Sequence, residues 1–289
     1  MIVAGESATL PAHLLHRLMR LAALASLVLL VAACDSADDD AVRITLRAGE
    51  MRRYEVAYAT DTTGGGRGTL PTVVRTDRVV GVGQALDSLR GLTVVESTEA
   101  NPYDPTGTSQ TRMWYRPSAD RLEEVAYEFV SESVGTFGLR SARPGELDPS
   151  LPLLVRQAVA ARGTARPGGG GVVRGPQART PARIVLEYPA EAGRVWTHFE
   201  VDSFFRSTRE VVGMETVQTP AGTFRCVVVR THLIFGGAPD DSIDWVDWIA
   251  AAGLVQRRIV YRDQILTDEQ GNEIARVTTT QTDRLAAAE

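Results

Sequence analysis

Residues 215–234, ETVQTPAGTFRCVVVRTHLI, decide the fold of this chain. Two stretches rich in β-branched residues flank the tripeptide Pro220-Ala221-Gly222. Proline presets φ at the start of a tight turn, and glycine accepts the positive φ that closes one. We therefore expect two antiparallel neighbouring strands here, joined by a short turn.

Strand-like runs continue on both sides of this hairpin. Their spacing and their β-branched content favour antiparallel neighbours over strand–helix–strand units. The expected strands are residues 42–46, 53–58, 72–82, 92–97, 111–116, 122–130, 184–188, 195–201, 204–214, 215–219, 223–234, 242–248, 254–262 and 274–284. Loops are expected at residues 61–70 and 267–272. The sequence therefore predicts a mainly β body, built as a curved antiparallel sheet or half-barrel.

One short helix is expected in the body, at residues 149–161. Its apolar residues recur along one side at helical spacing. They are Leu151, Leu154, Val155, Ala158 and Val159. Pro152 is compatible with this helix because it lies in the first turn. We expect the helix to cover part of the sheet, and the glycine- and arginine-rich residues 163–180 to form a loop or linker.

The body repeats several short patterns, which is consistent with two tandem β-meander halves, residues 42–148 and 181–289, joined through residues 149–180. The paired patterns are Gly49 before Tyr54-Glu55-Val56 with Gly193 before Phe199-Glu200-Val201, Val79-Val80-Gly81 with Val211-Val212-Gly213, Gly91-Leu92-Thr93 with Gly222-Thr223-Phe224, and Trp114 before Leu122 with Trp248 before Leu254. Unrelated meanders also share glycine turns and valine strands, so both interpretations stay open. A duplication would give two stacked meanders or one long continuous sheet.

A leader precedes the body. Arg17 and Arg20 flank an apolar segment, residues 21–31, which is shorter than the ~20 residues of a membrane-spanning helix. That length fits the apolar region of a signal peptide, while a buried helix or a single-span anchor is the alternative. Residues 31–34, Val-Ala-Ala-Cys, resemble the signal sequence of bacterial lipoproteins. The resemblance implies cleavage before Cys34.

The lipoprotein resemblance divides the chain into a signal peptide at residues 1–33, an acidic tether at residues 34–41 and an antiparallel β domain at residues 42–289. It also implies export and attachment to a membrane through acyl chains, such as palmitate, on Cys34. Met19 is an alternative start of translation. We expect the protein in the bacterial cell envelope, at the outer membrane and on its periplasmic or surface face.

The acidic tether permits three interpretations. Asp35, Asp38, Asp39 and Asp40 follow the cysteine directly. In some lipoprotein families an acidic run at this place is an address for the cell surface. In others, an aspartate beside the cysteine means retention at the inner membrane. A solvated spacer without an address function is the third interpretation.

Composition limits the partners and the redox chemistry. The net charge is −5, and all 31 basic residues counted as lysine or arginine are arginine. An acidic body gives no electrostatic reason to expect nucleic acid. If Cys34 is acylated, Cys226 is the only other cysteine and no intramolecular disulfide can form. We expect Cys226 to be a small buried apolar residue.

The C-terminal half carries a second resemblance. Residues 212–226 contain the pattern G-x-E-x-V-x-x-P-A-G-x-F, and a tryptophan-containing strand then leads to Gly253-Leu254-Val255. This half resembles uncharacterised exported bacterial β proteins, which are loosely compared to the half-barrel carriers of lipoproteins in the periplasm. The pattern describes turns and core positions, so the resemblance implies an architecture and no catalytic residue.

No motif for catalysis, metal or cofactor binding stands out. The chain has no nucleophile elbow and no phosphate loop between a strand and a helix. His198 and His232 lie on different expected strands, which argues against a histidine-based zinc site. Asp244 and Asp247 are expected on opposite faces of one strand. We therefore expect no catalytic residue, no metal and no cofactor.

Four tryptophans are candidates for a ligand pocket: Trp114, Trp196, Trp245 and Trp248. In a concave sheet such residues line an apolar pocket for an acyl chain, or they fill the space between the sheet and the helix. The first hypothesis is a non-enzymatic, membrane-anchored envelope lipoprotein that binds a lipid or another apolar or amphipathic ligand. The second is a structural or surface-interaction lipoprotein that binds a protein partner. An enzyme with an unrecognised site is the third.

Overall fold

A computed structural model describes residues 42–102, 104–132, 151–152, 154–156, 175–201, 205–235, 238–267, 270 and 272–289. The chain divides into two compact units, Met1–Asp40 and Ala41–Glu289. The first unit, with the expected signal peptide, Cys34 and most of the acidic tether, lies outside the described residues. Within the described part of the chain, no helix has the length and apolar character needed to span a bilayer.

In its described residues, the second unit is almost entirely sheet. Its strands are β1 (Met51–Thr62), β2 (Arg67–Thr69), β3 (Val73–Leu86), β4 (Leu89–Asn101), β5 (Asp104–Pro117), β6 (Arg121–Glu132), β7 (Gln177–Glu187), β8 (Val195–Val201), β9 (Phe205–Thr219), β10 (Gly222–Phe235), β11 (Ala238–Ala250), β12 (Gly253–Thr267) and β13 (Glu273–Ala288). All thirteen belong to one sheet, and neighbouring strands run antiparallel. The expected mainly β, antiparallel fold is confirmed.

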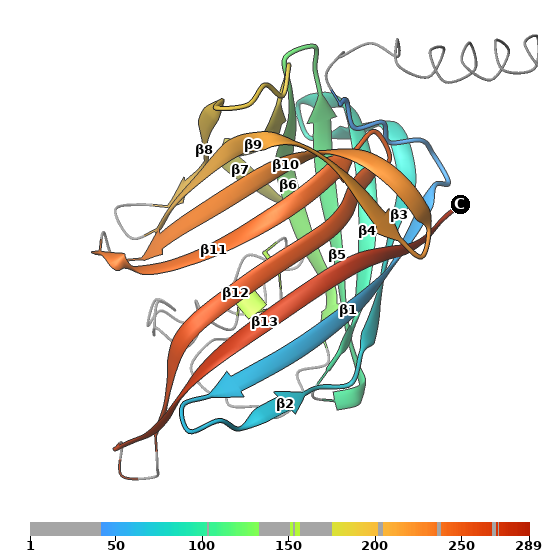
Figure 1. The fold of residues 1–289 in the computed structure, drawn as a ribbon. Helices are drawn as coiled ribbons and strands as arrows, with labels where there is room; N and C mark the ends of the chain where they lie inside the picture. The colour runs from blue at the N-terminus through green and yellow to red at the C-terminus, as the bar shows by residue number, and fades with distance from the viewer. Residues whose placement is uncertain are drawn as a thin grey trace, which may run out of the picture. The chain divides into compact units, whose positions relative to one another are not determined.

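The sheet curls into a nearly closed barrel (Figure 1). Twelve strands follow one another in the order β7-β6-β5-β4-β3-β1-β13-β12-β11-β10-β9-β8, while β2 pairs only with β1. Two meanders are therefore joined where the first strand of the body pairs with the last. That ladder runs from Arg52, opposite Ala288, to Thr62, opposite Val277. The two ends of the strand order are β7 and β8.

Side chains, rather than a backbone ladder, join β7 to β8. The carbonyl of Ile184 accepts hydrogen bonds from Trp196 Nε1 at 3.1 Å and from His198 Nδ1 at 2.6 Å. The carbonyl of Val185 accepts one from Arg209 Nη1 at 2.5 Å, which reaches over from β9. These bonds satisfy edge carbonyls that would otherwise lack a strand partner. We call this junction the β7–β8 seam.

Alternating side chains decide which face of the sheet is buried. In β1, Tyr54, Val56 and Tyr58 are buried and the residues between them are exposed. In β13, every second residue from Val277 to Leu285 is buried. This period of two is the geometry of a strand with one face on a core. The alternation in the sequence thus determines the interior of the barrel.

The N-terminal end of the body differs from the expectation. Residues 42–46 form no strand, although Val42, Ile44 and Leu46 alternate with exposed neighbours as predicted. The backbone N–H of Thr45 bonds to the carbonyl of Ala251, and that of Ile44 bonds to the hydroxyl of Tyr188. The segment is extended but has no ladder, because isolated bonds to a turn and a side chain replace a neighbouring strand.

Other boundaries also shift. The expected loop at residues 61–70 contains the end of β1 and all of β2, which pair with each other as a hairpin. The runs expected at residues 204–214 and 215–219 are one continuous strand, β9. Most of the helix expected at residues 149–161 lies outside the described residues. Residues 154–156 are helical, and the N–H of Arg156 bonds to the carbonyl of Pro152.

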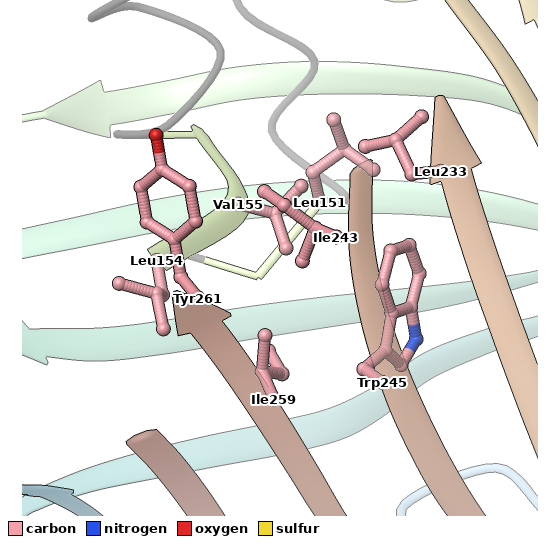
Figure 2. Close-up of a cluster of buried hydrophobic side chains, with 8 residues drawn as sticks. All are labelled: Leu151, Leu154, Val155, Leu233, Ile243, Trp245, Ile259 and Tyr261. Carbon is pink, nitrogen blue, oxygen red and sulfur yellow. The ribbon is translucent and has the colours of Figure 1, made fainter. Parts of the chain in front are cut away.

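The helical segment packs against the inner face of β10 to β12 (Figure 2). Its Leu151, Leu154 and Val155 are buried. Their partners on the three strands are Leu233, Ile243, Trp245, Ile259 and Tyr261. The segment covers part of the concave sheet, as the sequence analysis expected.

The two meanders share local geometry at the positions that repeat in the sequence. The N–H of Gly49 bonds to the carbonyl of Val79, and the N–H of Gly193 bonds to that of Val211. The N–H of each of these valines in turn donates to the backbone carbonyl of the residue that follows the glycine. Both glycines have positive φ, 84° and 85°.

Two bulges recur as well. Val80 and Val212 are the extra residues of β3 and β9, within the repeated Val-Val-Gly patterns. Val125 and Val255 are extra in β6 and β12, opposite Trp114 and Trp248. Bulges are specific structural features rather than random defects. They support the duplication, which stays a prediction.

Candidate ligand cavity

The inside of the barrel contains a cavity of ≈ 180 Å³. Its apolar lining residues include Ile44, Leu46, Val95, Met113, Leu122, Ile249 and Leu254. Its charged lining residues are Arg52, Arg75, Asp77, Glu99, Arg156, Arg209, Asp247 and Arg257. The volume is below the ~300–1,000 Å³ typical of small-molecule sites. The cavity therefore has a lining that suits an amphipathic ligand, but its volume is smaller than that of a typical ligand site.

Arg75 on β3 is the centre of the first charged cluster. Its Nη1 lies 2.6 Å from Oδ2 of Asp283, which is fully buried, and its Nε lies 3.4 Å from Oδ1 of Asp77. Its guanidinium also stacks over the ring of Tyr54, 4.2 Å from the ring centre. Ser97 donates a hydrogen bond to Asp77 at 2.7 Å. The cluster ties β3 and β4 to β13 across the inside of the barrel.

Asp247 on β11 holds the second charged cluster together. Arg209 Nη2 lies 2.7 Å from Oδ2 of Asp247, and Arg257 Nε lies 2.6 Å from Oδ1. Burial raises the pKa of Asp247, but Arg257 and Arg209 outweigh it and lower the pKa below its usual 3.8. The carboxylate is therefore ionised at neutral pH. One anion thus serves two cations, and Arg209 extends the cluster to the β7–β8 seam.

Glu99 has the opposite character. Burial raises the pKa of this carboxyl group above its usual 4.5, and Arg75 and Arg156 offset only part of that effect. The Tyr58 hydroxyl lies 3.4 Å from its Oε1. Glu99 lines the cavity beside Asp77 and Ser109. The cavity thus contains one carboxyl group that is costly to ionise and others that are fully paired.

Arg52 lines the cavity close to the backbone of Gly253. Its guanidinium binds Glu50 Oε1 at 2.7 Å and the carbonyl of Thr45 at 3.2 Å. A Cβ atom on Gly253 would lie 2.6 Å from Nη1 of Arg52. Gly253 also has φ of +94°, a conformation that favours glycine. The turn between β11 and β12 therefore favours glycine through its positive φ, whereas the contact with Arg52 involves the end of a flexible side chain that can shift.

The four candidate tryptophans divide between the two faces of the sheet. Trp196 pairs with the inward-facing Arg209, and Trp245 packs against the helical segment, so both lie inside. Trp114 alternates with the cavity residues Met113 and Tyr115, so it faces outward, where it packs with Leu92 and Val94. None of the four lines the cavity.

Trp248 completes this division. It alternates with the inward-facing Asp247 and Ile249, and its Nε1 donates to Glu215 on the outside at 2.7 Å. The structure therefore does not bring the four tryptophans together. Contact of Trp196 or Trp245 with a ligand stays a prediction.

The other residues considered in the sequence are also placed. His198 is buried and bonded to Ile184, whereas His232 is part-buried on the outer face and bonded to Asp244 at 2.7 Å. Asp244 and Asp247 point to opposite faces, as expected. Cys226 is buried, and burial raises the pKa of its thiol to about 11. Across the described residues, no three His, Cys, Asp or Glu side chains are close enough to hold a metal.

Sequence reasoning missed the buried charges. The signal was present as a break in the alternation: Arg75 and Asp77 occupy inward positions between Val73 and Val79. Asp247 likewise replaces an apolar residue between Trp245 and Ile249. A charged residue at an inward position is costly unless it is paired, so such a break indicates an internal network.

Comparison with known proteins gives two structural similarities. No family model and no curated protein matches the chain. A predicted exported protein with a YmcC-like fold from Bacteroides fragilis is 14% identical, with a TM-score of 0.32, over 86% of this chain and 99% of that chain. A predicted lipoprotein from Parabacteroides distasonis is 13% identical, with a TM-score of 0.35, over 87% and 100%. At these values neither structure assigns a ligand or an activity to this chain.

Proposed function

We propose that this chain is an exported lipoprotein of the bacterial envelope, attached to a membrane by acyl chains on Cys34. The support is the short apolar segment that ends in Val-Ala-Ala-Cys and is followed directly by an acidic run. Two or more acyl chains give stable attachment, so the anchor needs no membrane-spanning helix.

The body is a non-enzymatic binding module for an amphipathic ligand. The single observation that carries this proposal is the mixed lining of the cavity, which combines aliphatic side chains with several arginines. Two of its arginines form short ion pairs, Arg75 with Asp283 at 2.6 Å and Arg209 with Asp247 at 2.7 Å. Paired charges are suited to orienting a polar group and are poorly suited to transferring protons.

A second function, binding of a protein partner, is favoured by four exposed apolar side chains on β3 and β9. Val80 and Val82 on β3 are 46% and 49% exposed. Val212 and Met214, at the equivalent positions of β9, are 42% and 45% exposed. Replacing Val212 and Met214 by serine and measuring crosslinking to envelope proteins in intact cells tests this alternative. Loss of a specific crosslinked product would favour it.

Substitution of the cysteine tests the anchor. Cys34→Ser should abolish acyl labelling and release the protein from the membrane fraction. Cys226→Ser is the matched control and should change neither, because that thiol is buried in the sheet. Membrane association that survives Cys34→Ser would contradict the lipid anchor.

Native mass spectrometry tests the binding module. Protein purified from its own membrane should carry a bound mass in addition to the acyl chains. Ser109→Leu, which places a larger side chain against the cavity, should reduce the occupancy. A clean apo mass in repeated preparations would argue against ligand binding and would favour the alternative function, binding of a protein partner.

A further inference from the structure

A short segment of the chain occupies the inside of the barrel. We call its described residues, 151–152 and 154–156, the plug. The plug lies in the connection between β6, which ends at Glu132, and β7, which begins at Gln177.

The plug separates two different surfaces. On one side, its Leu151, Pro152 and Arg156 form part of the cavity wall. On the other side, Leu154 and Val155 cover the apolar inner face of β10 to β12 (Figure 2). The plug therefore contacts both the cavity and the apolar inner face of these strands.

The plug is packed inside the sheet without being part of it. Among the described residues, its backbone belongs to no strand ladder. The N–H of Leu154 bonds to a side-chain oxygen, Oε1 of Gln281, at the long distance of 3.3 Å. Gln281 is also bonded through its Nε2 to Asp283 at 2.8 Å. An exchange of the plug for a ligand therefore breaks no strand pairing.

The surface under the plug has the chemistry of an alkyl-chain site. It consists of Leu233, Ile243, Trp245, Ile259 and Tyr261, all buried by the plug and by one another. The branched aliphatic side chains of Leu151, Leu154 and Val155 bury against it as a hydrocarbon chain would. Burial of apolar area is non-directional, so a ligand chain can replace these contacts at similar free energy.

We propose that the plug is displaceable and that the face formed by Leu233, Ile243, Trp245, Ile259 and Tyr261 binds the hydrocarbon chain of an amphipathic ligand. The charged end of that ligand then lies in the adjoining cavity, near Arg75 and Arg257. This inference rests on the proposed binding function. It adds where the hydrocarbon chain binds and which class of ligand binds there. It also adds a closed state in which the plug occupies the site.

Quenching of tryptophan fluorescence by a fatty acid brominated in mid-chain tests the site, because bromine quenches tryptophan on contact. The double variant Leu154→Ser, Val155→Ser weakens the plug and should lower the dissociation constant of the probe by about tenfold. The matched control, Val80→Ser with Val82→Ser, changes two exposed valines of β3 that belong neither to the cavity nor to this face, and it should bind as the wild type does. Trp245→Phe in the plug variant should remove most of the quenching, since Trp245 is the tryptophan of this face.

Equal affinity in the plug variant and the wild type, or quenching that persists after Trp245→Phe, would overturn the proposal.

Hydrogen exchange of the wild type gives a readout that needs no destabilised variant. Saturating probe should accelerate exchange of the Leu154 amide, which is bonded to Gln281 in the closed state. Unchanged protection of that amide would also overturn it. A co-purifying ligand without any effect at Trp245 would leave the binding module intact and refute only this site.

Discussion

At the residue scale, paired charges replace part of the apolar core. Asp247 is 1% exposed and neutralises two arginines, so its loss leaves buried cations without a counter-ion. Breaking such a pair from one side is far more costly than removing a surface pair. The substitutions that matter most for stability are therefore the inward acids rather than the many exposed ones.

Asp247→Asn should lower the free energy of unfolding by about 3–5 kcal/mol, because Arg209 and Arg257 stay buried and lose their anion. Urea unfolding measures the change. Asp244→Asn is the matched control on the same strand and the opposite face, where the partly exposed pair with His232 is worth about 1 kcal/mol or less. Equal losses for the two variants would contradict the importance of the internal network.

His198 should make stability depend on pH. Burial lowers the pKa of this imidazole well below 6.5, and Arg209 and Arg183 lower it further. The unfolded chain then binds the proton more readily, so the stabilisation present above pH 6.5 is lost as the pH falls towards the folded-state pKa. The slope is about 1.4 kcal/mol per pH unit.

His198→Gln should flatten that decline between pH 6.5 and 5, because an amide does not titrate and can still donate to the carbonyl of Ile184. Urea denaturation at several pH values measures the slope. The control, His232→Gln, alters a histidine of the outer face and should still show the decline that His198 causes. A decline of wild-type steepness in His198→Gln would show that other groups cause it.

At the element scale, the β7–β8 seam differs from every other junction of the ordered strands. Eleven neighbouring pairs in the strand order share ladders, and this one is held by side chains of Trp196, His198 and Arg209. Side-chain bonds break one at a time, whereas a ladder is cooperative. We therefore expect the seam to open before the rest of the barrel.

Hydrogen exchange should show faster exchange for the amides of β7 and β8 than for those of β1 and β13, which form a long ladder. Trp196→Phe should accelerate β7 further, because the Ile184 carbonyl loses a donor worth about 1 kcal/mol. Trp248→Phe, which also removes an indole donor but lies on β11, should leave β7 unaffected. Uniform protection around the barrel would refute a weak seam.

At the whole-molecule scale, pairing of the first and last strands closes the fold. Met51 and Glu289 exchange backbone hydrogen bonds, both at 2.9 Å, so the ends of the body meet. The two meanders sit on either side of this junction and share turns and bulges at equivalent places. The order of the halves along the chain is therefore interchangeable in principle.

A circular permutant with the order 175–289 followed by 42–174 should fold to the same barrel. A flexible linker joins residue 289 to residue 42, and we expect a loss of stability of about 2 kcal/mol or less, since only loop closure changes. Circular dichroism and thermal unfolding measure it. A permutant opened at Gln281, inside β13, should fail to fold, because it interrupts the closing ladder. Equal behaviour of the two permutants would contradict the role of that ladder.

The sequence predicted twelve of the strands because a strand's signal is local. Alternation, β-branched content and turn residues such as Pro220 and Gly222 lie within a few positions of one another. The failure at residues 42–46 is instructive, since the alternation was correct and the ladder was absent. Whether an extended segment finds a neighbouring strand depends on residues far away in the chain.

The sequence by itself determined the β character, the antiparallel neighbours and the alternation that separates inside from outside, because each depends on the chain's own period of two. Only the tertiary structure decided that the sheet closes through β1 and β13, that Arg209 meets Asp247, and that the plug packs on the inner face of β10 to β12. These contacts join residues tens to hundreds of positions apart. Their partners are selected by barrel closure and by the cost of burying an unpaired charge, which no local pattern records.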